Sequence, residues 1–264
     1  MINRIILSIR KRLAFISPQK TVVRDGITYD LDCREVIDHS IYMGGWEPET
    51  LDFIRRFVKP GHTVLEIGAN IGAHTLLLAK AVGAGGRVYA VEPTRYAREK
   101  LLRNRELNPG LVDRIAVLDY LITDHIDEEQ RRSIKSSWRY AHQFEELKDE
   151  FVESPAITID ELWENHGEGR SVDVLKVDVD GYDYKALAGA SGVIGRFKPV
   201  IFVELCEWAQ RECGHSVRDI FELLEGHGYV ARTLTGTTAL NAPDVLSSIG
   251  EQGKIDAIFS PAAS

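Results

Sequence analysis

The feature that most constrains this chain is a regular alternation of short apolar strands and amphipathic helices that begins at Thr63. Runs such as Thr63–Ile67, Arg87–Val91 and Val200–Glu204 are rich in β-branched residues, and helical stretches such as Arg95–Leu107 separate them. Parallel strands need a crossover connection, and that crossover is right-handed, so the pattern predicts a parallel sheet with helices on both faces. We therefore expect an α/β protein.

The other expected elements extend this plan. A hairpin over residues 21–32 turns at Asp25-Gly26, a favoured two-residue turn. The final two strands are close in sequence, which allows an antiparallel pair at the edge of the sheet. The further elements are helices at Glu47–Val58, Ala73–Ala81, Tyr184–Gly189 and Val217–Glu225, and strands at Asp113–Leu118, Val172–Val177, Tyr229–Thr233 and Lys254–Ser260.

Two segments lie outside the alternation and define the domain organisation. We expect residues 1–46 to form an N-terminal extension with a helix and the hairpin, and residues 47–264 to form the main domain. Residues 125–153 interrupt the main domain with a polar, mixed-charge stretch that also holds Trp138, Tyr140 and His142. We interpret this stretch as an insertion over the open end of the sheet, and the alternative is a solvated surface excursion.

Charge is unevenly distributed along the chain. The formal net charge is −8, yet residues 1–24 hold six basic residues and no acid. The overall acidity argues against broad nucleic-acid binding, which needs a basic face. The basic segment, residues 1–20, is expected either to pack as a capping helix or to make a peripheral contact with an anionic membrane surface.

Two further features concern the compartment. The longest apolar runs are much shorter than the roughly 18–20 residues that a membrane helix needs. The three cysteines show no CxxC spacing, which favours a reducing, cytoplasmic environment.

The most informative segment is the turn after the first strand of the alternation. The strand Thr63–Ile67 runs into Gly68-Ala-Asn-Ile-Gly72, and glycines allow a sharp turn and the close approach of a ligand. The GxxxG spacing differs from the GxGxxG of dinucleotide-binding proteins, and Glu66 would repel a pyrophosphate. An acid at this point suits a ligand with an ammonium group, such as S-adenosylmethionine.

A second acid supports the same ligand. Glu92 ends the next strand and lies 20 residues after Gly72. A carboxylate at this position can accept hydrogen bonds from both ribose hydroxyls of an adenosine. The pair Glu66 and Glu92 therefore fits an adenosine ligand with an amino-acid end.

The strand over residues 172–177 ends in a group of acids. Lys176 lies inside this apolar strand, and because an unpaired buried ammonium is costly, we expect it to pair with Asp178 or Glu204. For Asp178, Asp180 and Asp183 three roles stay open: orienting substrate and cofactor, general base, or holding a divalent cation. The spacing excludes an EF-hand, and we favour a site without metal.

The sequence offers several candidates for a general base and for acceptor binding. We place Asp178 first as base or orienting group, with Glu204, His215 and His142 as alternates. Trp138 and Tyr140 are expected to contribute to an acceptor pocket, since aromatic faces stack on sugar rings. The remaining histidines that we weighed are expected at the surface: His62, His74, His166 and His227.

These segments together resemble the FkbM family of S-adenosylmethionine-dependent methyltransferases. The resemblance covers about residues 40–235, with order and spacing intact, and the segments that carry it are Val64–Gly72, Glu92-Pro93, Thr158–Leu162, Asp173–Gly181 and Ala186–Ala190. It implies the class I methyltransferase fold, a Rossmann-like, seven-stranded mixed sheet whose last strand is antiparallel. It also implies methyl transfer to a hydroxyl of a sugar, glycan, glycolipid or natural product.

The resemblance also implies roles for individual residues. Asp180 and Asp183 stand where the family has Glu, so their reach toward a substrate is shorter, and we assign Asp180 to the acceptor. The implied cofactor contacts are Glu66, Gly68, Asn70 and Gly72 for the methionine part, Glu92 for the ribose, Asp124 near the adenine, and Lys176 beside Asp178.

Two other functions compete with this interpretation. One is an NAD-dependent oxidoreductase or epimerase on the related dinucleotide fold, which the absence of GxGxxG and the presence of Glu66 disfavour. The other is a non-catalytic methyltransferase-like binding protein, which the intact glycine turn and both cofactor acids disfavour. The acceptor is a small molecule or glycan of unspecified identity, and the oligomeric state is open.

Overall fold

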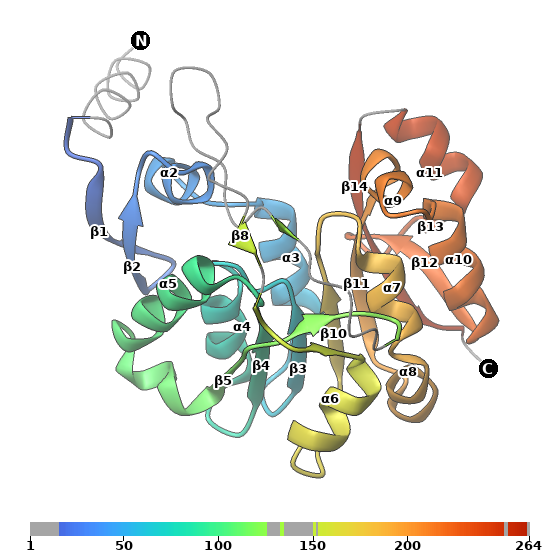
Figure 1. The fold of residues 1–264 in the computed structure, drawn as a ribbon, viewed down its shortest axis with the longest axis horizontal. Helices are drawn as coiled ribbons and strands as arrows, with labels where there is room; N and C mark the ends of the chain where they lie inside the picture. Colours follow the sequence, from blue (N-terminus) through green and yellow to red (C-terminus); the bar gives the residue numbers. More distant parts are fainter. Residues whose placement is uncertain (1–15, 126–132, 135–149, 152, 251–252, 263–264) are drawn as a thin grey trace.

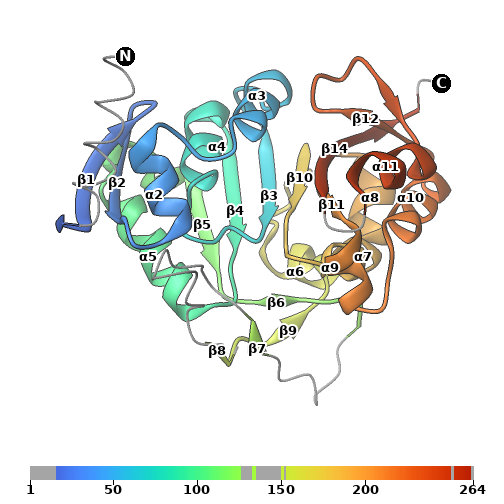
Figure 2. The same ribbon diagram turned by 90° about the horizontal axis from the view of Figure 1, so that it is seen from above.

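The computed structural model describes residues 16–125, 133–134, 150–151, 153–250 and 253–262. Its centre is an eight-stranded sheet, and Figure 2 shows the strands side by side with helices to either side of them. In spatial order the strands are β13 (Ala239–Leu240), β12 (Tyr229–Thr233), β14 (Lys254–Pro261), β11 (Val200–Cys206), β10 (Val174–Val177), β3 (Thr63–Ile67), β4 (Arg87–Val91) and β5 (Ile115–Leu118).

The direction of the strands matches the fold that the resemblance implies. Neighbouring strands from β5 through β11 run parallel, whereas β14 is antiparallel to both β11 and β12. The predicted antiparallel pairing of the last two long strands is confirmed. The sheet differs from the expected seven strands because the two-residue strand β13 pairs with β12, so β12 is not at the edge.

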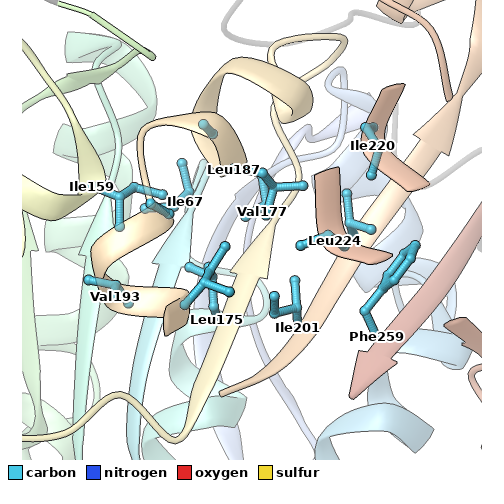
Figure 3. Packing of buried hydrophobic residues seen from close by; sticks show 14 of the residues in the cluster. Ile67, Ile159, Leu175, Val177, Leu187, Val193, Ile201, Ile220, Leu224 and Phe259 are labelled. Atoms are coloured by element: carbon cyan, nitrogen blue, oxygen red, sulfur yellow. The ribbon is translucent and has the colours of Figure 1, made fainter. Parts of the chain in front are cut away.

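Two apolar clusters cover the two faces of the sheet. Successive side chains of a strand point to opposite faces, and Leu65 belongs to one cluster while its neighbour Val64 belongs to the other. Figure 3 shows the first cluster, where Leu175 and Ile201 of the sheet face Val193 and Leu224 of the covering helices.

The helices divide between these faces. The first cluster includes residues of α6 (Ile159–His166), α7 (Asp183–Ala188), α8 (Ser191–Phe197), α10 (Val217–Gly226) and α11 (Ala242–Ile249). The second includes residues of α3 (Pro48–Phe57), α4 (Thr75–Val82) and α5 (Arg95–Glu106). A further helix, α9 (Glu207–Glu212), follows β11 directly. Both faces are therefore covered, as the parallel strands require.

The N-terminal extension packs on the second face. Strands β1 (Gln19–Arg24) and β2 (Ile27–Asp32) form the predicted hairpin, and helix α2 (Val36–Met43) follows. The backbone amides of Thr28 and Asp30 donate to the side-chain oxygens of Asn108 and Asn104, which join the hairpin to the end of α5. Residues 1–15 lie outside the described residues, so the membrane contact of the first segment stays a prediction (Figure 1).

The predicted insertion begins and ends at one place. Strand β6 (Leu121–Ile122) pairs in parallel with β9 (Ala156–Ile157), so the two ends of the excursion lie side by side. Between them, β7 (Ser133–Ile134) pairs with β8 (Glu150–Phe151). The three aromatic candidates of this segment, Trp138, Tyr140 and His142, lie outside the described residues.

Most other differences from the expected elements are at boundaries. The strand expected from Asp113 begins at Ile115 because Pro109–Arg114 forms a 3-10 helix, η1. Among the helices of the described residues, none is both long and apolar enough to span a membrane.

Candidate active site

The glycine turn between β3 and α4 packs directly against the end of β10. Gly68 has a φ of +83°, and a Cβ atom on it would lie 2.0 Å from the carbonyl oxygen of Asp178. Asn70 has a φ of +48°, a left-handed conformation that Asn tolerates better than most residues. The turn therefore needs glycine at position 68, because no side chain fits between the two strand ends.

A pocket of about 180 Å³ opens beside this turn. It lies at the carboxyl ends of β3, β10 and β11, where ligands of open α/β sheets bind. It contains five residues that the sequence analysis singled out, together with residues from α2 and from the loop before α3. The lining is Val36, Ile37, Trp46, Glu47, Gly68, Ala69, Asn70, Ala73, His74, Asp178, Asp180, Glu204 and Lys254.

Glu92 lies behind the glycine turn and is held in a fixed position. One carboxylate oxygen accepts a hydrogen bond from the Asn70 amide at 2.8 Å, and the other accepts from the amide and hydroxyl of Thr94. Burial raises the pKa of Glu92, and these hydrogen bonds act against that rise. Glu92 does not line the pocket itself, but Asn70, which donates to it, does.

Glu66 is buried at the end of β3 with one oxygen unpaired. Its Oε2 accepts a hydrogen bond from the Thr75 hydroxyl at 2.6 Å, whereas Oε1 has no hydrogen-bond partner. Burial raises the pKa of Glu66 to about 7, although the nearby Lys176 ammonium acts to lower it. A buried acceptor without a donor is unfavourable, so a ligand that supplies a donor here would be stabilising.

Lys176 pairs with Asp178, one of the two partners that the sequence analysis expected. The Lys176 Nζ donates to Asp178 Oδ2 at 2.8 Å, and the lysine side chain is only 1% exposed. Burial disfavours both charges, but their mutual attraction prevails: it raises the pKa of Lys176 and lowers the pKa of Asp178. Asp178 is thus ionised and faces the pocket.

Glu204, at the end of β11, pairs with a lysine that sequence reasoning missed. The Lys254 Nζ forms an ion pair with Glu204 Oε1 and lies 3.7 Å from Glu47 Oε1. Burial, followed by repulsion from Asp178, raises the pKa of Glu204 to about 8 and that of Glu47 to about 7. The pairing of the two strands explains this ion pair. Strand β14 runs antiparallel beside β11, so its first residue, Lys254, lies next to the carboxyl end of β11.

His74 corrects one expectation. It was expected at the surface, but its side chain is 7% exposed, lines the pocket and lies 3.7 Å from Glu47 Oε2. Burial lowers the pKa of His74 to about 3, so the imidazole is neutral. The sequence did contain a signal that could have placed His74 in the site, because it lies directly after the glycine turn. His215, in contrast, stacks on Tyr184 at 4.1 Å and does not line the pocket.

Three other predicted residues lie apart from the pocket lining. Asp183 accepts hydrogen bonds from the amides of Val179 and Gly181 and from the Gln210 side chain, so it holds the turn after β10. Asp124 accepts from the Thr123 hydroxyl and contacts His125. Gly72 packs against Leu101, where an added Cβ would lie 3.0 Å from the leucine side chain.

The site as a whole fits S-adenosylmethionine. Glu66 is buried directly before the turn, does not itself line the pocket and keeps one oxygen unpaired, and the turn lines the pocket at Gly68. The position of Glu92, fixed beside Asn70, suits the hydroxyls of a ribose.

Comparison with known proteins agrees with this arrangement. The sequence model of the methyltransferase FkbM domain matches residues 66–231, which is more than half of the chain. A curated relative, a protein-L-isoaspartate O-methyltransferase from Aeropyrum pernix, is 51% identical over 47 residues. That match covers 16% of this chain and 18% of the relative, so the chain spans less than a fifth of the relative's length.

Solved structures share the fold at low sequence identity. A protein described as an rRNA methylase from Clostridium thermocellum is 13% identical with a TM-score of 0.51, covering 83% of this chain and 97% of its own. An O-methyltransferase from Bacillus cereus, solved with S-adenosylhomocysteine, is 19% identical with a TM-score of 0.50, covering 83% and 82%. At these identities the likeness establishes the fold alone.

Proposed function

The chain belongs to the FkbM methyltransferase family, and we propose that it transfers a methyl group from S-adenosylmethionine to a hydroxyl of a sugar, glycan or natural product. The observation that carries this proposal is the placement of two acids at one glycine turn: Glu66 lies directly before the turn, and Glu92 accepts a hydrogen bond from the Asn70 amide within it. Glu66 keeps an unpaired oxygen, Glu92 is fixed by Asn70 and Thr94, and the turn opens onto an acidic pocket.

The residues of the turn would hold the cofactor. Glu66 and the backbone from Gly68 to Asn70 would bind its amino-acid end, and Glu92 would accept the ribose hydroxyls. When bound, S-adenosylmethionine supplies an electrophilic methyl group on a sulfonium. The two acids of the turn thus perform binding and orientation, which account for much of the barrier reduction in a direct displacement.

An acceptor hydroxyl must lose its proton as it attacks, and the pocket offers two kinds of carboxyl group. Asp178 is ionised, because Lys176 lowers its pKa, and it is suited to accept or orient a proton. Glu204 already accepts a hydrogen bond from the Lys254 ammonium, so it is less available to take a proton from an acceptor. We therefore keep Asp178 as the first candidate for base or orienting group, ahead of Glu204 and of His215, which lies outside the pocket lining.

The acceptor class depends on the segment between β6 and β9. Trp138 and Tyr140 in that segment are the residues that we propose for stacking on a sugar ring. Asp180 lines the pocket beside Asp178, and we propose that it contacts the acceptor.

Isothermal titration with S-adenosylhomocysteine tests the cofactor part of the proposal. The native chain should bind in the micromolar range, and Glu92→Ala should lose at least about tenfold in affinity, since it removes the ribose contacts. Glu106→Ala, which changes an exposed acid at the end of α5, is the matched control and should bind like the native chain. Binding of NAD in place of S-adenosylhomocysteine would support an oxidoreductase instead.

A turnover assay tests the reaction itself. Incubation with S-adenosylmethionine and a panel of sugars, glycolipids and phenolic natural products should release S-adenosylhomocysteine with at least one acceptor. Asp178→Asn should then lower kcat more than it weakens S-adenosylhomocysteine binding. Tight cofactor binding without turnover of any acceptor would favour the non-catalytic binding protein.

A further inference from the structure

Three potential metal ligands from separate parts of the chain converge in the pocket. Glu47 immediately precedes α3, His74 immediately precedes α4, and Asp178 follows β10. One ligating atom from each residue lies within 4.8 Å of those of the other two. We propose that Glu47, His74 and Asp178 bind a divalent first-row transition-metal ion.

The imidazole of His74 provides the strongest indication of a ligand. Its Nε2 is buried, has no hydrogen-bond partner and points toward the two carboxylates of the cluster. The distance from Nε2 to Glu47 Oε2 is 3.7 Å, which is too long for a hydrogen bond. A metal bound at about 2.1 Å in a tetrahedral site separates its ligands by about 3.4 Å, which is close to the distance between these two atoms. The Asp178 ligand atom lies within 4.8 Å of those of the other two residues, so closing the site requires these side chains to move together.

The charges around the cluster also favour a cation. Among the described residues that line the pocket, four are carboxylates and one is a lysine: Glu47, Asp178, Asp180 and Glu204 against Lys254. Lys176 binds Asp178 through Oδ2, and Lys254 approaches Glu47 through Oε1, whereas Glu47 Oε2 faces His74. A divalent ion would offset the negative charge that these lysines leave.

The composition of the cluster indicates the class of metal. Imidazole suits zinc, iron, nickel and copper, and carboxylates suit manganese and magnesium, so one imidazole with two carboxylates fits Mn²⁺, Fe²⁺ or Zn²⁺. Three protein ligands leave coordination positions open, as in catalytic metal sites. The side chains of Glu47 and Asp178 are each 23% exposed, so the open positions face the pocket.

The open positions give the ion a role in acceptor binding. An acceptor oxygen that enters the pocket would reach the ion beside Asp178, and coordination would fix its position and favour its deprotonated form. This role rests on the proposed methyl transfer, whereas metal binding itself does not. Asp178 would then act as a ligand and an orienting group.

Manganese titration, followed by the electron paramagnetic resonance signal of free Mn²⁺, tests the site on the full chain after chelator treatment. The native chain should bind one Mn²⁺ ion, and both Glu47→Gln and His74→Gln should weaken binding by about 30-fold or more. His215→Gln removes an imidazole outside the pocket lining and is the matched control for His74→Gln. This control should change the affinity less than about threefold.

Two outcomes of the same titration would overturn the proposal. Failure of the native, folded chain to bind Mn²⁺ below millimolar concentration, or equal binding by the cluster variants and the control, would exclude a specific site. Circular dichroism confirms that each variant is folded before titration.

A second titration at saturating S-adenosylhomocysteine separates this proposal from the proposed function. Retained Mn²⁺ affinity supports an ion on the acceptor side, whereas displacement of Mn²⁺ would overturn the proposal, because the cluster would then belong to the cofactor site. A chain that binds S-adenosylhomocysteine but no Mn²⁺ refutes the metal site and keeps the methyltransferase. A chain that binds Mn²⁺ but no S-adenosylhomocysteine supports the metal site and refutes the proposed methyl transfer.

Discussion

The molecule contains two clusters of buried charged groups that differ in what they leave open. In the first, which we call the closed cluster, Lys100 on α5 pairs with both Glu35 and Asp38, and the Tyr96 hydroxyl donates to Glu35. In the second, the open cluster, Lys176 interacts with Asp178 and Glu66, and Asp178 lines the pocket. Glu35 and Asp38 are fully buried, whereas Asp178 is 23% exposed.

This difference separates stabilising charges from functional ones. The closed cluster ties α2 to α5, and none of its residues lines the pocket. In the open cluster, Glu66 keeps an unpaired oxygen, and Asp178 lines a pocket that a ligand can enter. Burial of a charge alone is therefore weak evidence for function; access to a ligand is the informative property. Substitutions in the closed cluster should affect stability, and those in the open cluster should affect binding.

The largest expected effect comes from Lys100→Met. The substitution leaves two fully buried carboxylates without their ammonium, which should lower the free energy of unfolding by about 3–5 kcal/mol at pH 7. Urea denaturation measures it. Arg103→Met, which breaks a pair with Asp30 at an exposed arginine, is the control and should cost less than about 1 kcal/mol. Equal losses in both variants would contradict the comparison.

The pH dependence of stability should distinguish the two clusters next. Burial raises the pKa of Asp38 in the closed cluster to about 6, and the pKa of Glu66 and of Glu204 at the pocket to about 7 and about 8. A carboxyl group with a raised native pKa stabilises the fold below its unfolded pKa, and that contribution is lost as pH rises through the native value.

The ligand-free chain should therefore lose unfolding free energy from pH 4.5 to 8, by about 1.4 kcal/mol per pH unit for each of these groups that is ionised only in the unfolded chain. The part lost between pH 7 and 8 reports the carboxyls at and near the pocket, because Asp38, with a pKa of about 6, has completed most of its titration by pH 7. Urea midpoints at half-unit steps of pH measure this curve. A flat curve above pH 7 would mean that the pocket carboxyls are solvated.

Glu66→Gln should separate binding from stability. The amide keeps the shape of Glu66 and removes a buried charge, so the free energy of unfolding at pH 8 should not fall. Affinity for S-adenosylhomocysteine should decrease by about 10- to 100-fold, since the ammonium group loses its anionic partner. Calorimetric titration and urea denaturation of the same preparation test both halves, and loss of stability with unchanged affinity would reverse the assignment.

Tyr96→Phe has the smallest expected effect. It removes one hydrogen bond to Glu35 in the closed cluster, which should cost about 1–2 kcal/mol of unfolding free energy. Affinity for S-adenosylhomocysteine should stay within about twofold of the native value, because Tyr96 does not line the pocket. A change in affinity larger than the change in stability would mean that the closed cluster also shapes the site.

The sequence predicted the sheet better than the extension that covers it. Strands β3 and β4 begin and end where expected, because parallel strands buried on both faces are mostly apolar and stop at polar or glycine residues. Helix α2 was not predicted, since it is only eight residues long and buries Asp38 and His39, which obscures an apolar face. Its packing depends on Lys100, which no local pattern reveals.

The site was predictable where its residues lie within one segment. Glu66 lies in one strand and Gly68 and Asn70 directly follow it, and their spacing indicated the cofactor turn. Glu47 and Lys254 reach the same pocket from opposite ends of the chain, and only the tertiary arrangement of α3 and β14 brings them together. Local sequence reasoning has no means of joining residues at that separation.

The parallel pairing of β6 with β9 has a consequence for how such a protein can diversify. The amide of Leu121 donates to the carbonyl of Pro155, and the amide of Thr123 donates to that of Ile157, so the excursion between them leaves and rejoins the domain at one clasp. A segment with adjoining ends can be lengthened, shortened or exchanged between relatives without shifting the register of the main sheet. Evolution, or a protein engineer, can therefore graft new excursions onto this clasp while the glycine turn and its two acids remain as they are.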